Sequence, residues 1–267
     1  MPIASLNGAN IYYECQFPGR SSGNESALPG SWPVMVLAHG VGGNHAIWFN
    51  QIDPFSQTHQ VITFDHRGFG NSTDPQQLGR SAYADDLIAL LGHLEIERAA
   101  LVGQSMGGGT CIGVAAKAPH RITALVLADT LHGIALPKNA SDIMRKAQAA
   151  TAELGQIERV LGKRTRLEQP TKATLYRQLN SFNTTDRRNL KGAYPQLLTP
   201  HELGALGIPI LFIAGEDDVL FPVPAIREVQ SQVTGSEWVE MVGVGHSAFY
   251  EDPVTFNQHV LEFLHRH

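Results

Sequence analysis

Short apolar runs alternate with helix-like stretches along most of this chain, and this alternation constrains the fold more than any other feature. Several runs are almost continuously apolar, as expected of strands that are covered on both faces. Helical patterns lie between them, and a stretch rich in Ser, Gly and Pro over residues 18–33 predicts a loop. The alternation predicts an α/β fold with a mostly parallel sheet. The expected strands are 11–15 (paired with the residues before it), 34–38, 61–64, 99–102, 122–128, 208–214 and 237–242, with helices over 81–94 and 106–117.

A segment from residue 132 to residue 206 interrupts this alternation, because its pattern is helical throughout. Within it, Ser141 and Asp142 are typical of a helix N-terminus. A chain of 267 residues is long enough for one α/β domain that carries an insertion. We therefore predict a core domain of residues 1–131 and 207–267, with residues 132–206 inserted as a helical cap.

The sequence G-Q-S-M-G from Gly103 to Gly107 stands between an apolar run and a helical pattern. In that context it is typical of a nucleophile elbow, a sharp strand-to-helix turn that holds a serine in strained backbone. Small neighbours let strand and helix approach, and the positive end of the helix favours negative charge at the serine. We predict that Ser105 is a catalytic nucleophile.

A serine hydroxyl needs a base to become a good nucleophile, and acid and base follow the serine along the chain in sites of this kind. His246, after the last apolar run, is the candidate base. Three aspartates compete as the acid that holds the imidazole in the right tautomer. Asp217 and Asp218 follow one apolar run, and Asp129 follows the run before it.

The negative oxygen that forms during acyl transfer requires preorganised backbone N–H donors. The N–H of Met106, directly after the serine, is one candidate. The N–H of Val41 is the other, because Val41 lies in the glycine-rich loop from His39 to Gly43 that follows an apolar run. We take His39 itself as structural.

Taken together, these motifs resemble the α/β-hydrolase superfamily, in its branch of small capped serine hydrolases. His39-Gly40 resembles the oxyanion loop of the family, and residues 65–72, DHRGFGNS, resemble its D-x-R-G-x-G-x-S loop. The motifs occur in the family's order across nearly the whole chain. The resemblance implies the α/β-hydrolase fold, a mostly parallel eight-stranded sheet flanked by helices, with a helical cap inserted after strand 6.

The resemblance also bears on the acid. Asp218 fits the family's G-x-x-D-x-x-x-P pattern, which runs here from Gly215 to Pro222, and it is therefore favoured over Asp217. Some relatives place their acid where Asp129 stands, so Asp129 stays open as an alternative.

The reaction is less constrained than the fold, because this fold hosts many activities. Haloalkane dehalogenases and epoxide hydrolases carry an aspartate at the position of Ser105. The carbon–carbon bond hydrolases of ring-cleavage pathways often carry Ser-Met-Gly-Gly, as at 105–108, but tend to have Trp where this chain has Ser247. Enol-lactone hydrolases, small carboxylesterases and cofactor-free perhydrolases share the motif set.

We expect hydrolysis of an ester or lactone by a Ser-His-Asp triad, without cofactor or metal. The alternatives are carbon–carbon cleavage of a vinylogous diketone acid and a small-molecule receptor on a hydrolase scaffold.

Composition excludes some partners. The formal net charge of −5 offers no overall basic field for nucleic acid. The N-terminal residues have no basic start before an apolar run, and no apolar stretch approaches about 18 residues, so we expect neither a secretion signal nor a membrane span. Two cysteines outside any C-x-x-C pattern fit a reducing compartment, so we expect a cytoplasmic protein, with its oligomeric state left open.

Charge is distributed unevenly along the chain. Residues 138–191 hold twelve of the 20 Lys and Arg but five of the 25 Asp and Glu, which makes this stretch about +7 and the remainder about −12. A basic cap would attract an anionic substrate, but a solvated basic helix face, or packing of the cap against the acidic core domain, is the favoured explanation of the pattern. Candidate carboxylate partners are Arg145, Arg177, Arg187 and Arg188; Trp48 and Phe249 are candidates for the apolar pocket wall or for the core.

Overall fold

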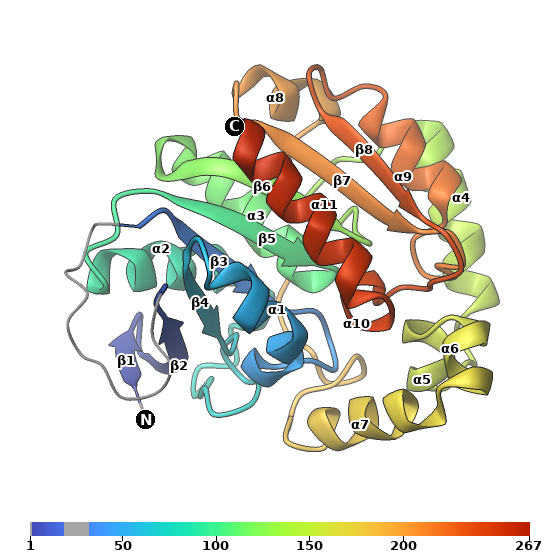
Figure 1. The fold of residues 1–267 in the computed structure, drawn as a ribbon, viewed down its shortest axis with the longest axis horizontal. Coiled ribbons are helices and arrows are strands. Elements are labelled where there is room, and N and C mark those ends of the chain that lie inside the picture. The colour runs from blue at the N-terminus through green and yellow to red at the C-terminus, as the bar shows by residue number, and fades with distance from the viewer. Residues whose placement is uncertain (1, 19–31) are drawn as a thin grey trace.

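An eight-stranded sheet lies between two layers of helices in the computed structural model, which describes residues 2–18 and 32–267 (Figure 1). The strand order is β1-β2-β4-β3-β5-β6-β7-β8. β2 is antiparallel to both of its neighbours, and β3 to β8 are parallel. The predicted α/β-hydrolase sheet is therefore confirmed. The strands are β1 Ile3–Leu6, β2 Ala9–Gln16, β3 Val34–Ala38, β4 Gln60–Phe64, β5 Ala99–Gln104, β6 Ile122–Ala128, β7 Ile210–Gly215 and β8 Glu237–Met241.

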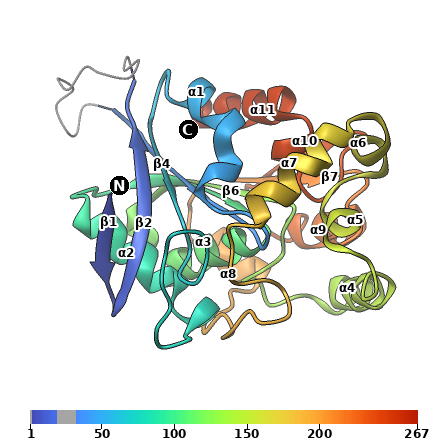
Figure 2. The same ribbon diagram turned by 90° about the horizontal axis from the view of Figure 1, so that it is seen from below.

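Helices cover both faces of the sheet (Figure 2). α1 (Phe49–Phe55) and α11 (Pro253–Arg266) pack on one face, and α2 (Tyr83–His93), α3 (Met106–Lys117) and α9 (Val223–Gln230) pack on the other. Double coverage explains why β5 and β7 are buried along their whole length and read as continuous apolar runs. Three 3₁₀ helices and one short α-helix complete the core: η1 His45–Trp48, η2 Gly79–Ser81, η3 Pro119–Arg121 and α10 Ala248–Glu251.

The segment between β6 and β7 is helical in part. It contains α4 (Lys138–Ala150), α5 (Gln156–Val160), α6 (Lys163–Glu168), α7 (Pro170–Asn180) and α8 (Pro200–Ala205). Residues 181–199 are described throughout and contain no helix, so the expectation of a helical pattern across the whole segment was wrong there. α4 packs against α9 of the core layers, whereas α5, α6 and α7 lie together at one end of the molecule (Figure 1). The division into a core domain and a cap of residues 132–206 stays a prediction.

The start of α4 differs from the sequence expectation. The helix begins at Lys138, directly after Pro137, so Ser141 and Asp142 lie inside its first turns instead of capping it. The Asp142 carboxylate is 2.9 Å from Lys138 Nζ and 2.7 Å from Arg145 Nη2. Asp142 therefore contributes ion pairs along the helix surface in place of a cap.

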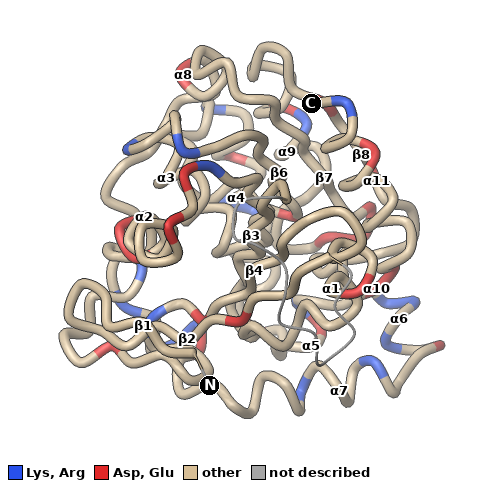
Figure 3. The backbone as a smooth tube through the Cα atoms, turned by 60° about the vertical axis from the view of Figure 1, so that its left-hand side comes forward, with Lys and Arg blue, Asp and Glu red and all other residues tan. Residues whose placement is uncertain are grey.

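Lys and Arg lie on both α6 and α7, as Figure 3 shows by their blue colour, and on other elements as well. We expected a loop over residues 18–33, and residues 19–31 of this stretch lie outside the described residues.

In the described part of the chain, every helix is too short or too polar to cross a bilayer.

Candidate active site

Ser105 stands at the turn between β5 and α3, where the backbone adopts φ 50° and ψ −118°. Such a conformation is strained for a residue with a side chain. Two glycines make the turn possible: a Cβ at Gly107 would lie 2.0 Å from the carbonyl oxygen of Ala38, and a Cβ at Gly103 would lie 2.7 Å from Gly108. The Ser105 N–H donates to Ala128 O at 3.0 Å, so the turn is also held by β6. The serine is thus fixed at the positive end of a 12-residue helix.

His246 and Asp218 form a buried pair. His246 Nδ1 lies 2.9 Å from Asp218 Oδ2, and both side chains are almost fully buried. The other carboxylate oxygen, Asp218 Oδ1, accepts the N–H groups of Leu220 at 2.7 Å and Phe221 at 3.0 Å. Gln104 holds the histidine loop by donating from Nε2 to His246 O at 2.8 Å. These bonds fix the imidazole in one orientation, with its Nε2 free of the carboxylate.

Asp217 and Asp129, the two other candidates for the acid, occupy different positions from Asp218. Asp217 is exposed. Asp129 is fully buried, with Oδ1 accepting the N–H of Gly215 at 2.8 Å and Oδ2 accepting the N–H of Ala248 at 3.1 Å. Burial, and then the charge of Asp218, raise the pKa of Asp129 well above its usual value. Asp129 therefore links the ends of β6 and β7 to the loop after His246, whereas Asp218 contacts the imidazole.

The two candidate oxyanion donors belong to segments that border the same pocket. Met106 is the first residue of α3, and Val41 follows β3. His39, next to this loop, is fully buried; its Nδ1 is 2.9 Å from Gly40 O and its Nε2 accepts the His66 N–H at 3.1 Å. Burial lowers the pKa of His39 to about 4. The ring is a neutral structural connector between two loops, as expected.

The loop over residues 65–72 supports this corner of the site. Asp65 Oδ1 accepts the N–H of His45 at 2.6 Å, and Asp65 Oδ2 accepts the N–H of Asn71 at 2.8 Å. Arg67 donates from Nε and Nη2 to the two oxygens of Asp86, each at 2.6 Å, inside the protein. A buried bidentate pair of this kind fixes the loop over residues 65–72, which contacts the segment of the candidate oxyanion donor Val41 through the His66–His39 hydrogen bond.

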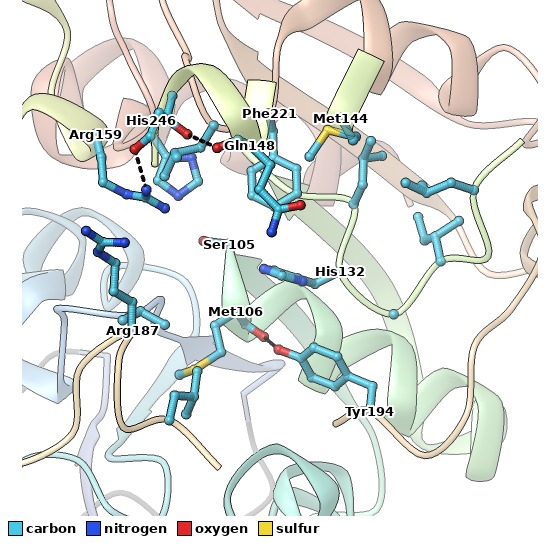
Figure 4. A pocket seen from close by; sticks show the side chains of 18 of the residues that line it. Ser105, Met106, His132, Met144, Gln148, Arg159, Arg187, Tyr194, Phe221 and His246 are labelled. Atoms are coloured by element: carbon cyan, nitrogen blue, oxygen red, sulfur yellow. Dashed lines mark hydrogen bonds between the residues drawn. The ribbon is translucent and has the colours of Figure 1, made fainter. Parts of the chain in front are cut away.

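A pocket of about 720 Å³ opens onto Ser105 and His246 (Figure 4). Residues of β-strand ends form one wall, and residues between 131 and 197 form most of the other. Among the described residues, the lining includes Arg80, Arg145, Arg159 and Arg187 and no Asp or Glu. The pocket therefore combines the candidate serine with an excess of positive charge.

The candidates for substrate binding separate into three groups. Trp48 and Phe249 are buried and pack together at 4.4 Å between ring centroids in the core, away from the pocket lining, so they were wrong as wall residues. Arg177 is exposed on α7 and is also outside the lining. Arg145 lines the pocket and pairs with Asp142.

The remaining two arginine candidates are adjacent in the chain. Arg187 lines the pocket beside Ser105, and Arg188 lines a smaller neighbouring cavity.

Sequence reasoning missed several lining residues. Arg159 lies in the basic stretch but was not singled out among its twelve cations, and Arg80 lies outside that stretch. His132 follows the end of β6, and its ring lies 5.1 Å from Phe221 and 5.6 Å from Tyr194, centroid to centroid. Burial, and then the charges of Arg80 and His246, lower the pKa of His132 to about 4. Its place after a strand that ends at the site was the available signal.

In the part of the chain that is described, no three His, Cys, Asp or Glu side chains form a possible metal site. The pocket offers a serine hydroxyl, an imidazole that is paired with a buried carboxylate outside the lining, candidate backbone donors and cationic side chains. This set can carry out acyl transfer through a covalent intermediate.

Comparison with known families gives one match over most of the chain. Residues 33–253 match the family model described as alpha/beta hydrolase fold. Among curated proteins, the chain is similar to a putative carbamate hydrolase, RutD, of Agrobacterium fabrum. The two are 28% identical over 247 residues, which cover 87% of this chain and 93% of the relative.

Two solved structures resemble this chain over almost their whole length. One, Est816, is described as an N-acyl homoserine lactone degrading enzyme; it has a TM-score of 0.77 and 25% identity, covering 98% of this chain and 100% of its own. The other is the enol-lactonase from Burkholderia xenovorans, with a TM-score of 0.78 and 25% identity, covering 98% of this chain and 99% of its own. Both neighbours are described as acting on lactones.

Proposed function

This chain belongs to the α/β-hydrolase fold family, and we propose that it is a serine hydrolase that cleaves a carboxylic ester or a lactone through an acyl-enzyme. The observation that carries the proposal is the buried His246–Asp218 pair, 2.9 Å apart, on the wall of the pocket into which the strained turn presents Ser105. The two solved structures described as lactone enzymes add support from likeness alone.

The proposed reaction begins with proton transfer from Ser105 Oγ to His246 Nε2, as Oγ attacks the carbonyl carbon. Asp218 accepts a hydrogen bond from His246 Nδ1 and stabilises the imidazolium without taking the proton. The imidazolium then protonates the leaving alcohol, or the ring oxygen of a lactone. Water, deprotonated by His246, attacks the acyl-enzyme and releases the acid.

In this scheme the tetrahedral oxygen is held by the N–H groups of Val41 and Met106. Each such donor is worth about 10²–10³ in rate in well-studied enzymes. Met106 has the further advantage of the helix end, where N–H groups lack partners within the helix. The loop of Val41 is held in place from the opposite wall, since Gln156 Nε2 donates to Val41 O at 3.3 Å.

We further propose that residues 132–206 act as the cap of the pocket, because Met144, Gln148 and Arg159, among others, line it. We propose a cytoplasmic setting as well, with which the free thiols of Cys15 and Cys111 are compatible.

The test is hydrolysis of p-nitrophenyl acetate and butyrate by the wild type and by Ser105→Ala in parallel. We expect turnover by the wild type and a loss of about 10⁴- to 10⁶-fold in the variant. Circular dichroism and thermal unfolding of both proteins serve as the control for folding. Wild-type turnover in a folded Ser105→Ala variant, or no turnover of any ester or lactone by a folded wild type, would contradict the proposal.

A further inference from the structure

Two arginines of the helical segment meet inside the pocket. Arg159 donates from Nη1 to Thr151 O at 2.7 Å, and Arg187 donates from Nη2 to Ala152 O at 3.4 Å. The two guanidinium groups are therefore held by adjacent carbonyl groups at the end of α4. Figure 4 shows them pointing toward one another at one end of the pocket, near His246 and Ser105.

Neither guanidinium has an acidic partner. Among residues 2–18 and 32–267, no carboxylate lies within ion-pair distance of Arg159 or Arg187. The acids next to them in sequence are engaged otherwise: Glu158 accepts the Gly155 N–H at 3.0 Å, and Asp186 accepts the Arg188 N–H at 2.7 Å. The pair thus presents two positive charges that are not neutralised.

The proximity of the two charges affects the pKa of Arg159. Burial, and then the neighbouring charge of Arg187, lower the pKa of the Arg159 guanidinium. By contrast, Arg145 in the same pocket is paired with Asp142 at 2.7 Å. The two like charges, on the half-buried Arg159 and the exposed Arg187, repel each other, and an anion between them removes the repulsion.

We propose that Arg159 and Arg187 form an anion-binding subsite that takes a carboxylate on the substrate, at the opposite end from the carbonyl that Ser105 attacks. The proposal rests on the proposed hydrolase function of the same pocket. Guanidinium groups match the geometry of a carboxylate, with two parallel N–H donors each. Figure 4 shows Arg159 and Arg187 on one side of Ser105 and Met144 on the other, so the carboxylate of the substrate lies on the arginine side, and apolar side chains such as Met144 form the lining on the other side. The substrate class is therefore a half-ester or lactone that bears a free carboxylate.

The first experiment compares two p-nitrophenyl esters that differ at one end. Mono-p-nitrophenyl glutarate carries a carboxylate where p-nitrophenyl pentanoate carries a methyl group. We expect Arg159→Gln and Arg187→Gln each to lower the glutarate-to-pentanoate ratio of kcat/KM about tenfold or more, because a charge-assisted hydrogen bond is lost. Arg177→Gln removes the same charge from the same segment outside the pocket and should leave the ratio unchanged.

The result that overturns the subsite is an equal effect of Arg159→Gln and Arg187→Gln on both esters, or an effect of Arg177→Gln of the same size. A second measurement separates the subsite from the reaction. Calorimetric titration of Ser105→Ala with monomethyl glutarate should give a dissociation constant that rises about tenfold or more when Arg159→Gln is added. If the folded wild type hydrolyses neither these two esters nor any other ester or lactone, the proposed function fails, and the titration still decides the subsite: an unchanged dissociation constant overturns it.

Discussion

The two walls of the pocket are built in different ways. On the sheet side, Ser105, Asp218 and His246 are each held by hydrogen bonds to buried backbone or side-chain groups. On the side of residues 132–206, the functional candidates Arg159 and Arg187 are half-buried or exposed, and each is held by a hydrogen bond to one carbonyl. The groups proposed for chemistry are fixed in place, whereas those proposed for recognition are loosely held.

The difference indicates how such a molecule can change its substrate. Substitutions in the helical segment alter the pocket without touching the buried pair of His246 and Asp218. The two walls are nevertheless linked by hydrogen bonds. In one of these links, Glu251 accepts the Gly162 N–H through Oε2 and the Gly245 N–H through Oε1, both at 2.9 Å. This carboxylate connects the start of α6 to the histidine loop, so the part of the segment nearest the imidazole is the least free to vary.

The sharpest test of the sheet side is Asp218→Asn. An amide at this position cannot hold the imidazole in the required tautomer, and we expect kcat to fall about 10⁴-fold. Rates of p-nitrophenyl butyrate hydrolysis at saturating substrate measure the effect.

Two neighbouring variants serve as controls for Asp218→Asn. Asp217 is exposed, so Asp217→Asn should stay within about twofold of the wild type. Asp129→Asn should lower the unfolding free energy by about 1–3 kcal/mol, because one buried N–H loses its acceptor, and should reduce kcat far less than Asp218→Asn. A larger loss of kcat in Asp129→Asn would reassign the acid.

A second test asks how strongly the sheet side depends on buried polar contacts. The pKa of His39 is lowered from 6.5 to about 4, so the folded protein resists its protonation. His39 therefore contributes stability that is present above about pH 6.5 and is lost as the pH falls toward about 4. Relative to His39→Gln, the wild type should lose about 2 kcal/mol of unfolding free energy between about pH 7 and about pH 5.

Urea unfolding of wild type and His39→Gln at the two pH values measures this difference. The comparison between two proteins cancels the contributions of Asp129 and Glu251, whose raised pKa values act in the opposite direction with pH. A difference that stays constant with pH would show that His39 is protonated as readily in the folded protein as in the unfolded chain.

The smallest expected effect concerns the helical segment and salt. If its positive charges attract an anionic substrate, kcat/KM for mono-p-nitrophenyl glutarate should fall about three- to tenfold between about 0.02 M and about 0.5 M NaCl. Values for p-nitrophenyl pentanoate should change little. If kcat/KM falls equally with salt for both esters, the positive charges of residues 132–206 do not attract the anionic substrate, and the two walls do not differ in this respect.

The pocket residues on the sheet side could be predicted from the sequence for a physical reason. Gly103 and Gly107 are required by the close backbone approaches around the turn at Ser105, so local sequence and local geometry determine one another there. The parallel strands could be predicted as well, because strands that are buried on both faces have continuous apolar sequences.

The opposite wall was harder to predict. Arg159 and Arg187 are two of twelve cations in their stretch, and they come together because their guanidinium groups donate to the adjacent carbonyls of Thr151 and Ala152, just after α4. Trp48 and Phe249 look like wall residues in sequence but lie in the core, since large apolar side chains suit both places. The helix-free residues 181–199 escaped notice because a polar, periodic pattern does not by itself make a helix.

The backbone of Ser105 has a consequence for how this chain can evolve. At φ 50° a glycine would relieve strain that the serine imposes, so selection for stability and selection for turnover act in opposite directions at this one codon. A descendant that kept the pocket only to bind its ligand would no longer have a reason to keep the serine. Its loss would be among the earliest marks of an enzyme becoming a receptor.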